Sequence, residues 1–69
     1  MTSLHKVIDL VGTSGTSIDD AIQGAISQAG KTLHGLEWFE VSAIRGGIRD
    51  GGVSEFQVVL RVGFKLDPR

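Results

Sequence analysis

Residues 50–66, Asp-Gly-Gly-Val-Ser-Glu-Phe-Gln-Val-Val-Leu-Arg-Val-Gly-Phe-Lys-Leu (DGGVSEFQVVLRVGFKL), decide the fold. Every second residue in the latter part of this stretch is apolar, namely Phe56, Val58, Leu60, Val62, Phe64 and Leu66. A period of two predicts a strand with one apolar face and one mostly polar face. Asp50-Gly51 is a strong signal for a two-residue hairpin turn. The residues on either side of this turn are therefore predicted to form a long hairpin.

The position of the turn also predicts which residues lie opposite each other. With Asp50-Gly51 at the tip, Glu40 faces Arg61 and Trp38 faces Gly63. The first pair is a favourable cross-strand charge pair, and the register keeps the two apolar faces together. A bulge near Gly46-Gly47 would shift the pairing by one residue.

Alternation on the first arm of the hairpin assigns its side chains to two faces. Phe39, Val41 and Ala43 are expected on the core side of the sheet. The intervening residues, Trp38, Glu40 and Ser42, are expected on the opposite face. Trp38 is the only tryptophan of the chain, so its expected place outside the core requires an explanation.

Upstream of the hairpin, a strand and a helix are predicted. Residues 6–11 (KVIDLV) are rich in β-branched residues and read as a strand. Thr16 with Asp19, and Ser17 with Asp20, then match the spacing of a capping box with Asp in place of Glu. A helical apolar stripe follows, comprising Ile18, Ala21, Ile22, Ala25, Ile26, Ala29 and Leu33.

The predicted helix ends near residue 34. Lys31 and His34 are expected in its last turn, where His34 would neutralise the terminal carbonyl groups, and Gly35 is expected at C′. Gly24 and Gly30 would lie inside the helix, at a cost of about 1 kcal/mol each relative to alanine. They are interpreted as points of close packing against a neighbour.

The resulting order is β-α-β-β, an α+β fold with a three-stranded, antiparallel-type sheet packed on one helix. The crossover rule makes the first two strands parallel, and the last strand fits antiparallel between them. Residues 1–69 are expected to form a single domain.

Size and composition favour a self-associating protein. A chain of 69 residues has a marginal core of its own, and the absence of cysteine excludes disulfides and thiolate metal sites. The two histidines, His5 and His34, are too few for a structural zinc site, and His5 is expected to be solvated at a frayed end. No metal site is predicted. Oligomerisation is then the expected additional source of stability.

Charge and hydropathy exclude two classes of partner. The formal net charge of −1, with acids and bases interspersed, gives no basic face for nucleic acid. No apolar run approaches the roughly 20 residues of a membrane span, and no signal-peptide core is seen at the N-terminus. A cytoplasmic location without membrane association is expected.

Trp38 and Gln57 are the candidate binding residues that the alternation pattern identifies. Trp38 is either packed in a subunit interface or serves as a stacking platform for a flat aromatic ligand, with Gly63 leaving room over the ring. The Gln57 amide has the donors and acceptor needed to read the edge of an imide-like heterocycle. In the predicted register Gln57 opposes Ile44, about 20 Å along the sheet from Trp38. A shared site would therefore combine residues from different subunits.

Three stretches of the sequence resemble the dodecins, a family of small flavin-binding proteins. These stretches are KVIDLVGTSGTSIDDAI (residues 6–22), WFEVSAIRGGIRDGGV (residues 38–53) and FQVVLRVGFKL (residues 56–66). The resemblance implies a β-α-β-β fold assembled as a hollow homododecamer. It also implies pairs of flavins sandwiched between tryptophans of symmetry-related subunits.

Residue roles follow from the resemblance at the matching positions. It implies that Trp38 stacks on the flavin, that Gln57 bonds the edge of the isoalloxazine, and that Arg45 lies near the ring. Lys65 would help to hold the FMN phosphate, and Glu37 is included among the expected flavin-binding residues. The expected cofactor is FMN, with riboflavin or FAD as alternatives.

A second ligand is also implied, because some dodecins bind coenzyme A. The matching positions of this chain are Lys6, Gln28, Thr32, Leu33 and His34.

Three positions depart from the pattern of many bacterial relatives. Gly47 follows Arg45-Gly46 where many relatives have a histidine, and Gly15 stands in place of a frequent proline. Lys65 replaces a frequent arginine, which makes a phosphate contact a point charge rather than a fork. These differences bear on which flavin is preferred and how tightly it binds.

The sequence thus predicts a non-catalytic protein that binds and stores FMN or riboflavin and protects it from light. The alternative is a small oligomeric structural or isomerase-like protein with an intersubunit site and no role in flavin binding. Flavin uptake would distinguish the two.

Overall fold

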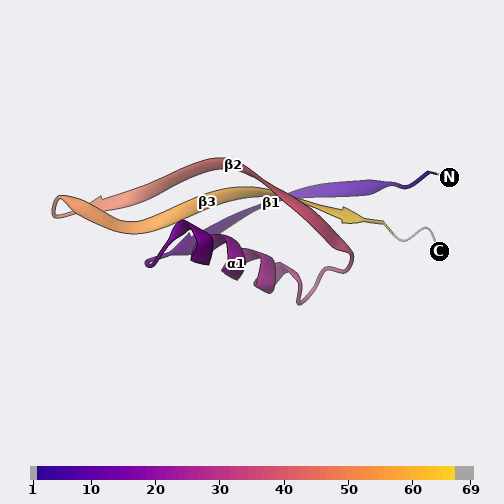
Figure 1. Cartoon of the computed structure of the whole chain (residues 1–69), viewed down its shortest axis with the longest axis horizontal. Helices are drawn as coiled ribbons and strands as arrows, with labels where there is room; N and C mark the ends of the chain where they lie inside the picture. Colours follow the sequence, from indigo (N-terminus) through magenta and orange to yellow (C-terminus); the bar gives the residue numbers. More distant parts are fainter. Residues whose placement is uncertain (1, 67–69) are drawn as a thin grey trace.

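The computed structural model describes residues 2–66 and has the predicted β-α-β-β order. Its elements are β1 (His5–Ser14), α1 (Ile18–Ala29), β2 (Leu36–Arg49) and β3 (Gly52–Lys65). The strands form one sheet in the order β1-β3-β2, with β3 antiparallel to both neighbours. The helix lies against one face of this sheet (Figure 1). The predicted place of the last strand between the other two is confirmed.

The turn between β2 and β3 lies where the sequence predicts it. Arg49 pairs with Gly52, which leaves Asp50 and Gly51 as the two loop residues. Both have positive φ, 52° for Asp50 and 78° for Gly51. A type I′ turn requires positive φ at both central positions, and its twist matches that of the flanking strands. The Asp-Gly pair therefore fixes the tip of the hairpin.

The helix starts at a capping network built on serine. Ser17 has extended backbone at the N-cap, and its hydroxyl accepts the Asp20 backbone N–H at 2.9 Å. Ser14 is buried, donates its hydroxyl to the Asp20 carboxylate at 2.7 Å and accepts the Thr16 N–H at 2.9 Å. The predicted cap at Ser17 is confirmed. The carboxylate, however, binds Ser14 and does not return to the N-cap backbone as in a full capping box.

The predicted end of the helix is wrong by about one turn. α1 ends at Ala29, and Gly30 occupies the C-cap, donating its N–H to the Ile26 carbonyl at 2.9 Å. Gly30 and the β-branched Thr32 are weak helix formers, so the apolar Leu33 does not extend the helix. His34 consequently lies beyond the last helical turn and cannot neutralise it.

Close packing between the helix and β1 occurs at Gly12, and not at Gly24, where the sequence predicts it. A Cβ on Gly12 would lie 2.4 Å from the Ala21 carbonyl oxygen, so this glycine is where the helix approaches β1 closely. A Cβ on Gly24 would meet nothing within 4 Å. Close packing at Gly24 is therefore not found within the single chain.

The core lies between the helix and only two of the three strands. Val58, Leu60 and Val62 of β3 are at most 1% exposed and pack with Ala21 of the helix. Further apolar residues surround this cluster: Ile8, Leu10, Ile18, Ile22, Ala25, Ile26 and Leu36. Leu36, at the start of β2, is the only residue of that strand in the cluster.

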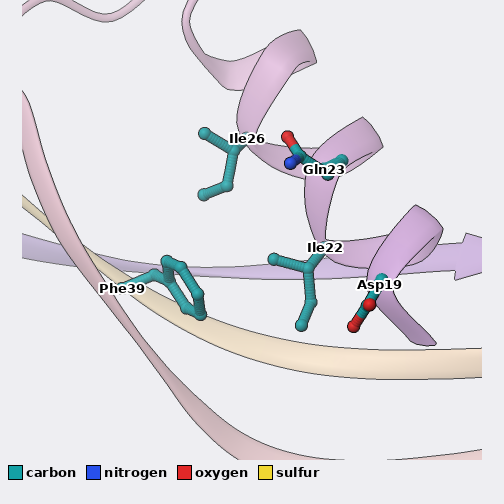
Figure 2. Close-up of a pocket in the computed structure, with 5 residues that line it drawn as sticks. All are labelled: Asp19, Ile22, Gln23, Ile26 and Phe39. Carbon is teal, nitrogen blue, oxygen red and sulfur yellow. The ribbon is translucent and has the colours of Figure 1, made fainter.

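Most of the β2 half of the inner face is left uncovered. Phe39 and Val41, expected in the core, are 47% and 40% exposed. Phe39 lies on the helix side, across a pocket of about 320 Å³ from Ile22 and Ile26 (Figure 2). Its predicted face is therefore correct, but its predicted burial is wrong for the single chain, because the helix packs over β1 and β3 instead.

A β-bulge changes the predicted register in the middle of the hairpin. Pairing follows the predicted register from Trp38 to Val41, and then skips Ser42, so that Ala43 pairs with Val59. The predicted alignment of Gln57 with Ile44 is therefore wrong, and Gln57 pairs with Arg45. A second shift between Gly47 and Ile48 restores the original register towards the turn. The predicted bulge near Gly46-Gly47 is confirmed. The bulge at Ser42 was not predicted, because the alternation of apolar and polar residues does not indicate it.

Among residues 2–66, no helix has the length and apolar character required to cross a membrane.

Candidate functional site

The sheet face away from the helix, here called the outer face, holds Trp38 at one end. The indole is 44% exposed and lies directly on Gly63 of the neighbouring strand. A Cβ on Gly63 would come within 2.3 Å of the indole carbons Cη2 and Cζ2. The predicted pairing of Trp38 with Gly63 is confirmed, but the space that the glycine leaves is filled by the ring itself. The backbone of β3 therefore supports one side of the indole.

His5 and Glu37 support the same indole from the side. The centroids of the His5 and Trp38 rings are 5.3 Å apart, with the planes tilted by 59°. Nε2 of His5 lies 2.7 Å from Oε1 of Glu37. Since a carboxylate can only accept, Nε2 carries the proton in this bond. The expected solvation of His5 is wrong: it belongs to β1 and contacts the candidate site.

Glu37 is the residue that a register shift inserts between Leu36 and Trp38. Its carboxylate reaches His5, whereas the sequence places it among the flavin-binding residues. In the structure its carboxylate contacts the imidazole that lies beside the indole, and its expected contact with a flavin stays a prediction. Lys65, the other candidate at this end, pairs with His5 across β1 and β3 and is exposed.

The other end of the outer face contains a chain of side-chain hydrogen bonds centred on Gln57. Nε of Arg45 donates to Oε1 of Gln57 at 2.8 Å. Nε2 of Gln57 in turn donates to Oε2 of Glu55 at 3.0 Å. Arg45 is exposed, while Gln57 and Glu55 are half-buried. Glu55 was not among the predicted site residues, although its place two residues before Gln57 puts both on one face of the strand.

A single chain does not bring the two ends together. Trp38 pairs with Gly63, which is six residues from Gln57 along β3. At about 3.3 Å per residue this corresponds to roughly 20 Å. The sequence-predicted residues thus lie in two separate groups, one with Trp38 and Lys65 and one with Arg45 and Gln57. A small ligand could contact both groups only where two subunits meet.

Three of the five candidate residues for coenzyme A share a second pocket. It lies between β1 and the helix and has a volume of about 350 Å³. Its lining consists of Leu10, Val11, Ala25, Gln28, Ala29, Thr32 and Leu33. Lys6 and His34 are not part of this lining.

In the part of the chain that the structure describes, no group of three or more His, Cys, Asp or Glu side chains is placed to hold a metal ion.

The fold and the divided outer face define a class of small β-α-β-β proteins whose exposed sheet carries two separate groups of candidate binding residues. Comparison with known proteins agrees with this class. The family model described as Dodecin matches residues 4–67. The chain therefore belongs to the dodecin family, as the sequence resemblance indicates.

Individual relatives share both sequence and fold over nearly the whole chain. A dodecin from Thermus thermophilus is 52% identical over 67 residues, which is 97% of each chain. A crystal structure of a Thermus thermophilus protein superposes with a TM-score of 0.93 at 50% identity, covering 99% of this chain and 100% of the other. The predicted fold class is confirmed by this match.

A more distant relative differs in its ligand. The crystal structure of calcium dodecin from Mycobacterium tuberculosis, described as calcium chelating, has a TM-score of 0.81 at 30% identity. The match covers 96% of this chain and 94% of the calcium dodecin chain. Members of the family can therefore bind ligands of different chemistry.

Proposed function

We propose that this protein is a non-catalytic flavin-binding and storage protein that takes up FMN or riboflavin as a homododecamer. The observation that carries the proposal is the exposed indole of Trp38, held on the outer face by the backbone of Gly63 and the ring of His5. An indole fixed in this way offers its free side to a flat ring, and aromatic stacking is favourable beyond the area that it buries.

The group with Gln57 supplies what stacking cannot. Stacking fixes the plane of a flavin but tolerates rotation within that plane, whereas a side-chain amide bonds one edge of the ring. Since Gln57 lies roughly 20 Å from Trp38 along one chain, the two act on one flavin only when they come from different subunits. Arg45 is then near the ring, and Lys65 at the Trp38 end contributes a point charge to the phosphate of FMN. FAD would use the same ring contacts.

Assembly is supported by the surface that the single chain leaves open. The side chains of Phe39, Val41 and Ile44 are 40–55% exposed, and Ile48 is 81% exposed. A domain of this size buries too little apolar surface to be robust alone. Association of subunits through these strands covers the apolar residues and brings the two groups together.

The indole also gives the proposed complex a photochemical property. A tryptophan in van der Waals contact with an excited flavin can donate an electron to it, and return of that electron to the indole leaves both groups in their ground states. Bound flavin should therefore be weakly fluorescent and protected from light-driven reactions. Protection of the stored flavin from light is therefore the expected function of binding it in this cytoplasmic protein.

Coenzyme A is proposed as a second ligand with a separate site. Gln28, Thr32 and Leu33 share the pocket between β1 and the helix, which offers apolar walls and two polar side chains. Lys6 and His34 would contact parts of the ligand that extend beyond this pocket.

A flavin titration tests the main proposal. Refolded apoprotein is titrated into FMN and riboflavin while flavin emission is recorded, and native mass spectrometry gives the number of subunits and bound ligands. Strong quenching together with a twelve-subunit mass is expected. Unchanged emission at micromolar protein would refute flavin storage and favour the structural or isomerase-like alternative.

A further inference from the structure

We infer that Arg45 and Glu55 together lock the Gln57 side-chain amide in one orientation, so that it recognises a ring edge with one order of donor and acceptor. Glu55 is then a positioning residue that sets the specificity of the site without touching the ligand. The inference rests on the proposed flavin function and specifies the chemistry of the edge that is recognised.

The two neighbours of Gln57 differ in what they can do in a hydrogen bond. The arginine guanidinium has only donors, and an ionised carboxylate has only acceptors. The atom that faces Arg45 at 2.8 Å must therefore be the amide oxygen. The atom that faces Glu55 at 3.0 Å must be the amide nitrogen. Rotating the amide by 180° would replace both charge-assisted bonds with donor–donor and acceptor–acceptor contacts.

Backbone geometry makes this arrangement a property of the fold. Glu55 and Gln57 are two residues apart on β3, so their side chains lie on the same face. Arg45 pairs with Gln57 only because the bulge at Ser42 shifts the register by one residue. Strand pairing thus brings the Arg45 donor to Gln57, and alternation along β3 brings the Glu55 acceptor. The half-buried state of Glu55 and Gln57 limits competition from water.

The position opposite Glu55 leaves its carboxylate free for this role. Gly47 pairs with Glu55, and a Cβ built on Gly47 would lie 3.5 Å from Cγ and 3.9 Å from Oε2 of that glutamate. A side chain at position 47 would first have to displace Ser54 Oγ, 2.6 Å from the Cβ, and a polar one could then reach the carboxylate and compete with Gln57 for it.

What remains free on the amide defines the ligand. After the two bonds, Gln57 keeps one lone pair on Oε1 and one N–H on Nε2. The complementary edge has an N–H next to a carbonyl group, which is the arrangement in a cyclic imide such as the pyrimidine ring of a flavin. Methylation of the imide nitrogen removes the donor and leaves the acceptor in place.

The test compares riboflavin with N3-methylriboflavin by fluorescence quenching of the dodecamer. We expect the wild-type protein to bind riboflavin about tenfold more tightly than the methylated analogue, the size of one well-oriented hydrogen bond. Q57L measures the steric part of the methyl effect, and its ratio is the baseline. E55L should lower the ratio towards that baseline, because one of the two bonds that orient the amide is lost and Arg45 alone then holds it.

Two further variants separate positioning from other effects. E55Q keeps an acceptor oxygen but not the charge, so it should restore most of the wild-type ratio. E40A removes an acid from the same face, away from Gln57, and should leave the ratio unchanged. Native mass spectrometry establishes that each variant is assembled, and if E55L does not assemble, E55K provides the same test by opposing a donor to the Gln57 N–H.

The outcomes distinguish a failure of flavin binding from a failure of the proposed role of Glu55. If wild-type protein quenches neither flavin, the proposed function fails. If it binds riboflavin but E55L or E55K keeps the full wild-type ratio, flavin binding stands and the orienting role of Glu55 is refuted. If E55Q gives the same low affinity ratio as E55L, the positioning role is likewise refuted. The charge of Glu55 would then act on the ligand directly.

Discussion

The two ends of the outer face hold their candidate binding residues by different physical means. At one end Trp38 is held by packing, with the Gly63 backbone beneath it and the His5 ring beside it. At the other end Gln57 is held by hydrogen bonds from and to charged neighbours. Packing fixes a plane and tolerates many flat ligands, whereas directional bonds select an edge. Affinity and selectivity should therefore be separable by mutation, one at each end.

Gly63→Ala should have the largest effect on the protein. The new Cβ would lie 2.3 Å from two indole carbons, so the ring must leave its present place. Overpacking of this kind typically lowers the free energy of unfolding by about 1–3 kcal/mol. Urea denaturation at a fixed protein concentration measures this free energy of unfolding. The affinity for flavin should fall as well, because the indole is displaced.

Gly24→Ala is the matched control for this substitution. Its Cβ would meet nothing within 4 Å, and alanine favours the helix by about 1 kcal/mol over glycine. A wild-type stability for Gly63→Ala would contradict the packing of the indole on β3.

Trp38→Ala should weaken flavin binding by more than about 1 kcal/mol, because the aromatic stack is lost. The oligomer should survive, since the indole lies on the outer face and not in the core. Titration and native mass spectrometry on the same sample measure both quantities. Disassembly of the oligomer would instead favour a role for the indole in packing between subunits.

His5→Ala should have an intermediate effect. It removes the lateral support of the indole and leaves Glu37 without its partner at 2.7 Å. Exposed pairs of this kind contribute about 0.2–1 kcal/mol, so a loss of riboflavin affinity of up to about fivefold is expected. A double-mutant cycle with Glu37→Ala measures the coupling. Additive effects would show that Glu37 does not act through His5.

Lys65→Ala should have the smallest effect and should separate FMN from riboflavin. The exposed ammonium acts on the phosphate as a screened point charge, so FMN affinity should fall about twofold at low salt. Riboflavin, which lacks the phosphate, should bind as before. Equal losses for both flavins would place Lys65 next to the ring instead.

The features that strand alternation and turn chemistry control were predictable from sequence. The Asp50-Gly51 turn fixed the pairs Trp38 with Gly63 and Glu40 with Arg61, and the structure confirms both. Alternation likewise placed Trp38 and Gln57 on one face. These predictions succeed because turn geometry and a period of two are local properties of the chain.

The remaining features depend on contacts that the local sequence does not encode. Trp38 and Arg45 are seven residues apart, so strict alternation would place them on opposite faces. The bulge at Ser42 puts Arg45 opposite Gln57, and a serine gives no signal for it. The contact of His5 with Trp38 depends in turn on the register of β1 with β3, which is set across the helical crossover.

In the proposed oligomer, the half of the inner face that the helix leaves uncovered makes stability depend on the amount of protein. A chain whose apolar strand is buried only by its neighbours has no fixed melting temperature of its own, because dilution favours the separated, less stable form. The melting temperature should therefore rise with protein concentration. In a cell, newly made chains would remain vulnerable to proteases until enough copies had accumulated to associate, so the level of expression would determine whether the protein persists.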